Sequence, residues 1–70
     1  MAATASEKPL SMRERDVLRG VKRGLTTKEI ASELYLSEGT VRNYLSEAIS
    51  KMRCASRLDA VRHAESMGWL

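Results

Sequence analysis

The chain has few of the residues from which catalytic and metal sites are built. Its 70 residues include one cysteine, one histidine and one proline. One cysteine cannot form an internal disulfide, and with one histidine it cannot complete a zinc site. The sequence also contains no nucleophile–histidine–acid set and no glycine-rich phosphate loop. We therefore predict a protein that is not an enzyme, that uses no cofactor or metal, and that works in a reducing, cytoplasmic setting.

Long apolar runs and aromatic side chains are also scarce. No apolar run reaches 18 residues, and the first nine residues lack the apolar stretch of a signal peptide. Neither a membrane span nor a membrane partner is expected. Three aromatic residues (Tyr35, Tyr44 and Trp69) are too few for a platform that stacks single-stranded nucleic acid. The net charge of +3 permits a polyanionic partner without requiring one.

The residues that are present predict one all-α domain. Residues 1–9 are small, polar and unpatterned, which favours a linker or a disordered terminus and a fragment of a longer protein. Serine and threonine caps, two of them followed by glutamate at the third position, mark four helix starts in residues 10–70. Gly24 and Gly68 have the sequence context of helix stops. Apolar residues recur at helical spacing and never alternate, so we expect helices at about 12–23, 27–34, 38–53 and 57–67. The methionines at positions 12, 52 and 67 are expected to fill the core.

The second and third predicted helices have the spacing of a helix-turn-helix motif. Only Tyr35, Leu36 and Ser37 separate them, and in such a motif the second helix enters the major groove of DNA. Ala31 is small where the two helices must approach, and Leu36 is an apolar residue in the turn. The third predicted helix buries one apolar stripe and leaves these residues on its outer side: Gly39, Arg42, Asn43, Ser46, Glu47 and Ser50.

Four segments of the chain resemble a known family. Leu10–Leu18, Gly24–Ala31, Leu36–Leu45 and Ser56–Val61 resemble the LuxR/NarL type of helix-turn-helix domain, and the third segment is most similar to the response regulators of the DesR and LiaR types. The resemblance covers residues 10–70. It implies a four-helix output domain that binds double-stranded DNA and dimerises on it through the fourth helix. It also implies an N-terminal receiver domain, a sensor kinase upstream, and RNA polymerase as a further candidate partner.

The outer side of the third helix carries the predicted base contacts. Arginine can bridge O6 and N7 of guanine, and asparagine can pair with N6 and N7 of adenine. Arg42 and Asn43 lie early in the helix, where base edges are reached, and Ser46 follows one turn later. The resemblance places the main base-reading side chain at Arg42. The chain departs from the family pattern at Ser46, where relatives often have lysine, and at Glu47, which adds a negative charge beside it. Tyr44 also replaces the histidine that is common at its position in the family.

Predicted phosphate contacts lie at the starts of the second and third helices and further along the third helix. They are Thr27, Lys28, Ser37, Thr40, Tyr44 and Lys51. Several of these side chains have a structural alternative. The hydroxyls of Thr27, Ser37 and Thr40 can cap helices, and Lys51 can complement the C-terminus of its helix. For Glu14 the capping box makes a structural role the expected one.

The fourth predicted helix offers a surface for a second copy. Small apolar residues fill one face, and Leu58 lies off that face with Arg62 and Glu65 along the same side. The resemblance implies that these three residues meet a partner copy on DNA. An alternative function is a sigma-factor-like or stand-alone helix-turn-helix module that docks a protein partner. Binding to random duplex separates the two, because a DNA reader shows a steep salt dependence.

Overall fold

The computed structural model describes residues 10–70 as four helices. They are α2 (Met12–Lys22), α3 (Thr27–Leu34), α4 (Glu38–Lys51) and α5 (Arg57–Ser66), with no strand among the described residues. The prediction of an all-α, four-helix fold is confirmed. The bounds of α3 are those predicted, and the other helices end one or two residues earlier than predicted. The predicted linker at residues 1–9 lies outside the described residues.

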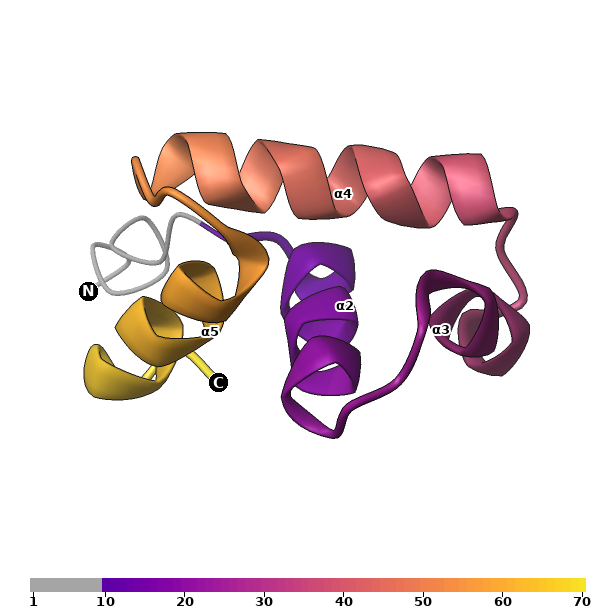
Figure 1. Ribbon diagram of the computed structural model, residues 1–70, viewed down its shortest axis with the longest axis horizontal. Helices are drawn as coiled ribbons and strands as arrows, with labels where there is room; N and C mark the ends of the chain where they lie inside the picture. Colours follow the sequence, from indigo (N-terminus) through magenta and orange to yellow (C-terminus); the bar gives the residue numbers. More distant parts are fainter. Residues whose placement is uncertain (1–9) are drawn as a thin grey trace, which may run out of the picture.

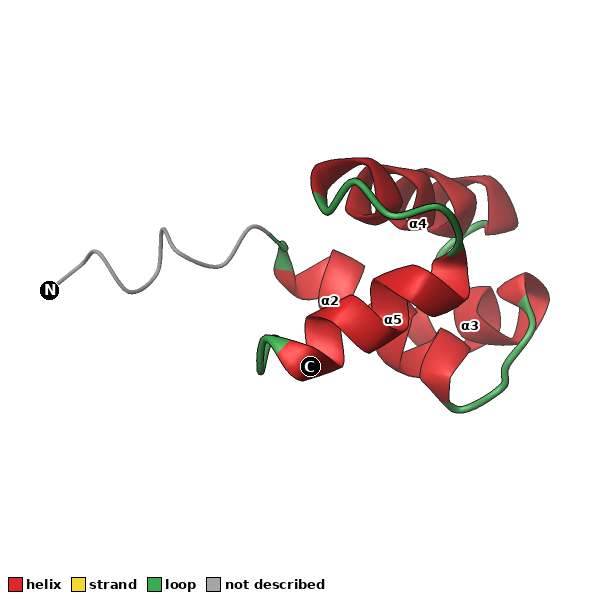
Figure 2. Ribbon diagram, turned by 60° about the vertical axis from the view of Figure 1, so that its left-hand side comes forward, coloured by secondary structure: helices red, strands yellow, loops and turns green. Residues whose placement is uncertain are grey.

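Helix α2 is the centre of the fold. It packs against α3, α4 and α5, while α4 also packs against α3 and α5. Figure 1 shows α4 running across the other helices, with α3 beneath its N-terminal half and α5 beneath its C-terminal half. Figure 2 shows the same arrangement from the side, with α4 forming one layer over the three shorter helices. The long helix therefore has one face on the core and the opposite face free.

Every helix begins at a side-chain cap that the sequence predicts. Ser11, Thr26, Ser37 and Ser56 each accept a hydrogen bond from the backbone N–H three residues later. At α2 and α3 the bond is reciprocal, because a glutamate returns to the N–H of the capping residue. Each cap satisfies a backbone donor that the helix leaves unpaired. The capping residue has an extended backbone, so the helix begins directly after it.

All four helices end in the same left-handed turn. Gly24, Tyr35, Arg53 and Gly68 have positive φ angles of 84°, 57°, 53° and 76°. In each case the next residue donates its N–H to a carbonyl five residues back, as in a Schellman motif. The glycine stops are confirmed. Tyr35 and Arg53 were not predicted, because nothing in the sequence distinguishes a tyrosine or arginine in this conformation.

The core lies between α2 and the inner faces of the other helices. Its fully buried side chains include Val17, Leu18 and Val41. Leu10, which precedes α2, is only 5% exposed and belongs to the core, although the sequence did not single it out. Trp69 and Leu70, which follow Gly68, fold back and pack on the core.

The prediction that three methionines fill the core is wrong for two of them. Met52 packs against the core, but Met12 and Met67 are 75% and 52% exposed. Met12 lies nine residues before the buried Val21, which is half a turn around the helix. Met67 follows the end of α5, beside the returning residues Trp69 and Leu70.

Candidate nucleic-acid interface

The connection between α3 and α4 fixes how α4 is presented. Tyr35 takes the left-handed conformation, and the N–H of Leu36 donates to the carbonyl of Ala31 at 2.9 Å. Leu36 packs against the core, so the turn is anchored by an apolar contact as well as by the backbone. Ser37 then caps α4. The three-residue connection is that of a helix-turn-helix motif with α4 as its second helix.

The side of α4 that faces away from the core carries the predicted base-contacting residues. Val41, Leu45 and Ala48 are buried beneath the helix. Arg42, Asn43 and Ser46 are all exposed, as predicted from the apolar stripe. The guanidinium of Arg42 lies 3.7 Å from the carboxylate of Glu38, one turn earlier. That ion pair draws the arginine along the helix surface toward the start of α4.

A shallow hollow lies along one flank of α4. Its volume is about 370 Å³, and it is lined by Arg42, Leu45, Ser46, Ile49 and Arg57. The first four residues form one stripe of α4, and Arg57 is the first residue of α5. Arg57 was not predicted from the sequence. No pattern within a single helix could have identified it, because its position beside α4 depends on how the two helices pack.

The predicted phosphate-contacting residues of α3 and α4 differ in how free their polar groups are. Lys28 is exposed in the first turn of α3, next to the half-buried Thr27. The hydroxyl of Ser37 accepts the N–H of Thr40 at 3.1 Å and lies 2.9 Å from the Thr40 hydroxyl. Both hydroxyls therefore contribute to the helix cap. Tyr44 is half-buried against the core.

Lys51 has an intramolecular partner that the sequence analysis did not foresee. Its ammonium nitrogen lies 2.9 and 3.0 Å from the two carboxylate oxygens of Glu14, whose side chain is 2% exposed. Glu14 also closes the cap of α2 by accepting the N–H of Ser11 at 2.9 Å. One buried carboxylate thus joins the start of α2 to the end of α4.

Burial and hydrogen bonding act in opposite directions on Glu14. Burial penalises the charged carboxylate and raises its pKa, whereas the Ser11 N–H and the ammonium of Lys51 favour the charged form. The favourable contacts prevail, so the pKa of Glu14 is lowered from its ordinary value of 4.5. The structural role expected of Glu14 in the capping box is confirmed, and the ion pair with Lys51 extends it.

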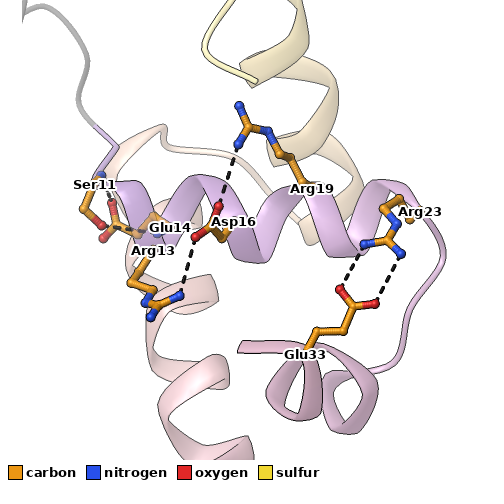
Figure 3. A network of polar contacts seen from close by, with 7 residues as sticks. All are labelled: Ser11, Arg13, Glu14, Asp16, Arg19, Arg23 and Glu33. Carbon is orange, nitrogen blue, oxygen red and sulfur yellow. Dashed lines mark hydrogen bonds and ion pairs between the residues drawn. The ribbon is translucent and has the colours of Figure 1, made fainter. Parts of the chain in front are cut away.

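Ion pairs surround α2, and one of them, at its C-terminal end, joins it to α3. Arg23 forms a two-pronged pair with Glu33 of α3, with distances of 3.0 and 3.2 Å (Figure 3). In the same view Arg13 and Arg19 lie on either side of Asp16. These basic side chains are thus engaged with carboxylates around α2.

Helix α5 presents an apolar residue at the surface. Leu58 is 64% exposed, which agrees with its predicted position off the core face. Arg62 and Glu65 are exposed as well. Glu65 forms an ion pair with Lys22 of α2, so its carboxylate has a partner within the chain. Of the three residues predicted for the dimer interface, Leu58 is the large apolar one.

Residues 10–70 contain no cluster of three or more histidine, cysteine, aspartate or glutamate side chains that could hold a metal ion. Within the same part of the chain, each helix is too short or too polar to cross a membrane. Cys54, half-buried between α4 and α5, is a free thiol.

Comparison with known proteins connects this geometry to a family. Residues 8–64 match the sequence profile of the bacterial regulatory proteins of the luxR family. The response regulator RamR of Streptomyces coelicolor is 45% identical over 64 residues, which are 91% of this chain and 32% of RamR. The transcriptional regulatory protein DesR of Bacillus subtilis is 44% identical over 61 residues, 87% of this chain and 31% of DesR.

A third relative has a different length. The spore germination protein GerE of Bacillus subtilis is 48% identical over 61 residues, which are 87% of this chain and 82% of GerE. The chain thus spans about a third of RamR and of DesR but most of GerE.

Proposed function

Because this chain belongs to the luxR family of bacterial regulatory proteins and is the helix-turn-helix DNA-binding domain of a transcriptional regulator, we propose that α4 reads a specific duplex sequence through Arg42, Asn43 and Ser46. The family binds DNA and is not enzymatic, in agreement with the prediction from the sequence. The observation that supports the proposed contacts is the free face of α4. It combines a guanidinium, an amide and a hydroxyl on the side away from the core.

The proposed phosphate contacts flank this face. Thr27 and Lys28 lie in the first turn of α3, Ser37 and Thr40 lie at the start of α4, and Tyr44 lies near its middle. These contacts set the register of the domain on the duplex and carry no sequence information. An ammonium has three N–H donors, so Lys51 can keep Glu14 as a partner and still direct positive charge to a nearby phosphate. In this proposal the domain acts in the cytoplasm, with the chromosome.

We further propose that two copies bind adjacent half-sites and meet through Leu58, Arg62 and Glu65 of α5. A single exposed leucine with two charged neighbours forms a small surface, so the free domain is monomeric and DNA supplies the second tether. The similarity to the response regulator RamR supports an N-terminal receiver domain and a sensor kinase in the complete protein, with RNA polymerase as a further partner. The similarity to GerE, of which the match covers 82%, supports the alternative of a stand-alone helix-turn-helix module.

Arg42→Ala tests the proposed reading of bases. A duplex selected from a random library serves as the specific site, and binding is measured by titration at several salt concentrations. The loss of a bidentate base contact should cost about 1–3 kcal/mol on the selected site and relax the preference at one base pair in each half-site. Arg19→Ala is the matched control, because that exposed arginine pairs with Asp16 on α2.

The controls also separate the alternatives. Equal losses on specific and random duplex would make Arg42 a phosphate contact and contradict the proposal. If the unchanged domain showed no salt-dependent affinity for any duplex, the protein-docking alternative would be preferred.

A further inference from the structure

The hollow between α4 and α5 has features that the proposed contacts of α4 do not use. Arg42, Leu45, Ser46 and Ile49 line it at intervals of three or four residues, so they form a single stripe along the flank of the helix. Arg57 closes the opposite side from the first turn of α5. The hollow is open and continuous with the free face of α4, because Arg42 and Ser46 belong to both.

The two arginines in the hollow differ in their partners. Arg42 lies 3.7 Å from Glu38 and is drawn toward the start of α4. Arg57 is exposed, and within residues 10–70 no carboxylate lies within ion-pair distance of its guanidinium. A guanidinium that has no acidic neighbour in the described part of the chain can bind an external anion. Two guanidinium groups on a shallow surface favour an extended polyanion over a small enclosed ligand.

The floor of the hollow is apolar. Leu45 is 6% exposed, and Ile49 is half-buried against the core. A nucleic-acid strand alternates charged phosphates with deoxyribose rings whose faces are largely apolar. Such a strand therefore matches both the arginine side and the leucine and isoleucine floor of the hollow, whereas a free phosphate would leave the floor uncovered.

Groove dimensions connect the hollow to the DNA that α4 reads. A helix with its side chains is about 10–12 Å across, and the major groove of B-DNA is about 12 Å wide. A helix seated in that groove consequently has one phosphate strand along each flank. The hollow lies along one flank of α4, on the side where α5 begins.

We propose that this hollow receives the sugar–phosphate backbone of one strand of the bound duplex, with Arg57 on a phosphate and Leu45 and Ile49 beneath an adjacent deoxyribose. The proposal deepens the function proposed above and rests on it, since it requires α4 in the major groove. It adds α5 to the elements that position the domain on DNA. Arg57 also directly precedes Leu58, so the phosphate contact and the proposed dimer surface are adjacent on one helix.

The first test compares two charge-removing variants, one in the hollow and one outside it, on a single half-site. Arg57→Gln should weaken binding roughly tenfold on specific and random duplexes alike, and lower the salt slope by about one unit. Arg19→Gln is the matched control: it removes the same charge from an exposed arginine of α2 that pairs with Asp16 and lies outside the hollow. A half-site duplex excludes dimerisation from the comparison. Circular dichroism checks that both variants keep their helices.

The second test identifies the phosphate. Each phosphate of the half-site duplex is replaced in turn by an uncharged methylphosphonate, and affinity is measured for the unchanged protein and for Arg57→Gln. We expect one position on one strand where the replacement weakens binding of the unchanged protein and has little further effect on the variant. Replacements elsewhere should weaken both proteins equally, because they remove contacts that Arg57 does not make.

The outcomes separate this proposal from the one on which it rests. The hollow would not contact DNA if the unchanged protein bound duplex with a steep salt slope, but Arg57→Gln bound as tightly as Arg19→Gln and differed from the unchanged protein at no phosphate. A variant that bound half-sites normally and lost only cooperativity on a full site would make the hollow a contact between copies, which also overturns the proposal. A protein with no salt-dependent binding to duplex would instead overturn the proposed function.

Discussion

At the scale of single residues, the helix ends present a conflict between residue type and backbone conformation. Tyr35 and Arg53 take positive φ angles that cost a residue with a Cβ atom about 1–2 kcal/mol. Tyr35 is 94% exposed, so its side chain contributes little packing that could offset this cost. We expect Tyr35→Gly to raise the free energy of unfolding by about 0.5–1 kcal/mol, even after the greater freedom of glycine in the unfolded chain. Urea denaturation monitored by circular dichroism measures this free energy of unfolding.

Gly24→Ala is the reciprocal control. Its φ angle is 84°, and a Cβ atom there would meet no atom within 4 Å, so only the backbone conformation opposes the change. The alanine variant should lose about 1 kcal/mol. A stabilised Gly24→Ala, or a Tyr35→Gly variant less stable than the unchanged protein, would contradict the account of these turns.

At the scale of elements, the close crossing of α2 and α3 depends on Gly20, which has no side chain. A Cβ atom at Gly20 would lie 2.6 Å from Cγ1 of Ile30, closer than carbon atoms can approach. Gly20→Ala should therefore destabilise the fold by about 1–3 kcal/mol, although alanine favours an isolated helix. Thermal unfolding of Gly20→Ala, Ile30→Ala and the double variant measures the coupling, and the glycine change should cost less when Ile30 is already truncated.

Gly39→Ala provides the comparison within α4. The nearest atom to a Cβ at Gly39 is the hydroxyl oxygen of Ser37 at 4.0 Å, so helix propensity acts there without a clash. This variant should gain about 0.5 kcal/mol. If Gly20→Ala and Gly39→Ala changed the free energy of unfolding in the same direction, close packing of α2 on α3 would not explain why position 20 needs a glycine.

The ion pair between α2 and α4 predicts a dependence of stability on pH. The pKa of Glu14 is lower in the folded protein than its ordinary value of 4.5. The stabilisation that it contributes is therefore fully present above about pH 4.5 and is lost as pH falls through the lowered value. Glu14→Gln should cost about 2 kcal/mol at pH 7, because Lys51 loses its partner, and the difference from the unchanged protein should shrink in acid.

Glu29→Gln controls for the capping box. Glutamine can fill the same capping role in both helices, so the two variants differ in the buried charge and its lysine. We expect a markedly smaller loss at Glu29, measured by urea denaturation at a series of pH values. Equal losses would mean that the Lys51 pair contributes nothing beyond the cap.

At the scale of the whole molecule, the arrangement of the helices leaves the side chain of Leu58 exposed and available to a second copy. Leu58→Arg should preserve folding and half-site binding and abolish cooperative binding to a full site, because an arginine on each copy would face its equivalent. Titration of half-site and full-site duplexes measures this. Met67→Arg is the matched control, since Met67 is also exposed and lies half a turn around from Leu58.

Two different outcomes of the Leu58→Arg experiment would contradict the dimer proposal. Unchanged cooperativity in Leu58→Arg would remove Leu58 from the interface. Loss of helical signal would show that the leucine supports the fold instead, despite its exposure.

Much of the fold and the free face of α4 could be predicted because their causes are local. A cap acts on an N–H three residues away, and an apolar stripe repeats within seven residues. Ser11, Thr26, Ser37 and Ser56 therefore fixed the helix starts, and the stripe beginning at Val41 determined which side of α4 is free. The resemblance to the LuxR type rested on the same segments, which the family match confirms.

Only the tertiary structure decided which distant residues meet. Glu14 and Lys51 are 37 residues apart, and no local pattern marks them as an ion pair. The contact of Gly20 with Ile30 and the position of Arg57 beside Arg42 likewise depend on how helices cross. Helix crossing is set by the joint packing of side chains from several elements, whereas capping and periodicity act within one element. For that reason the sequence determined which residues lie on the free face of α4, and the packing of α5 determined that an arginine lies next to them.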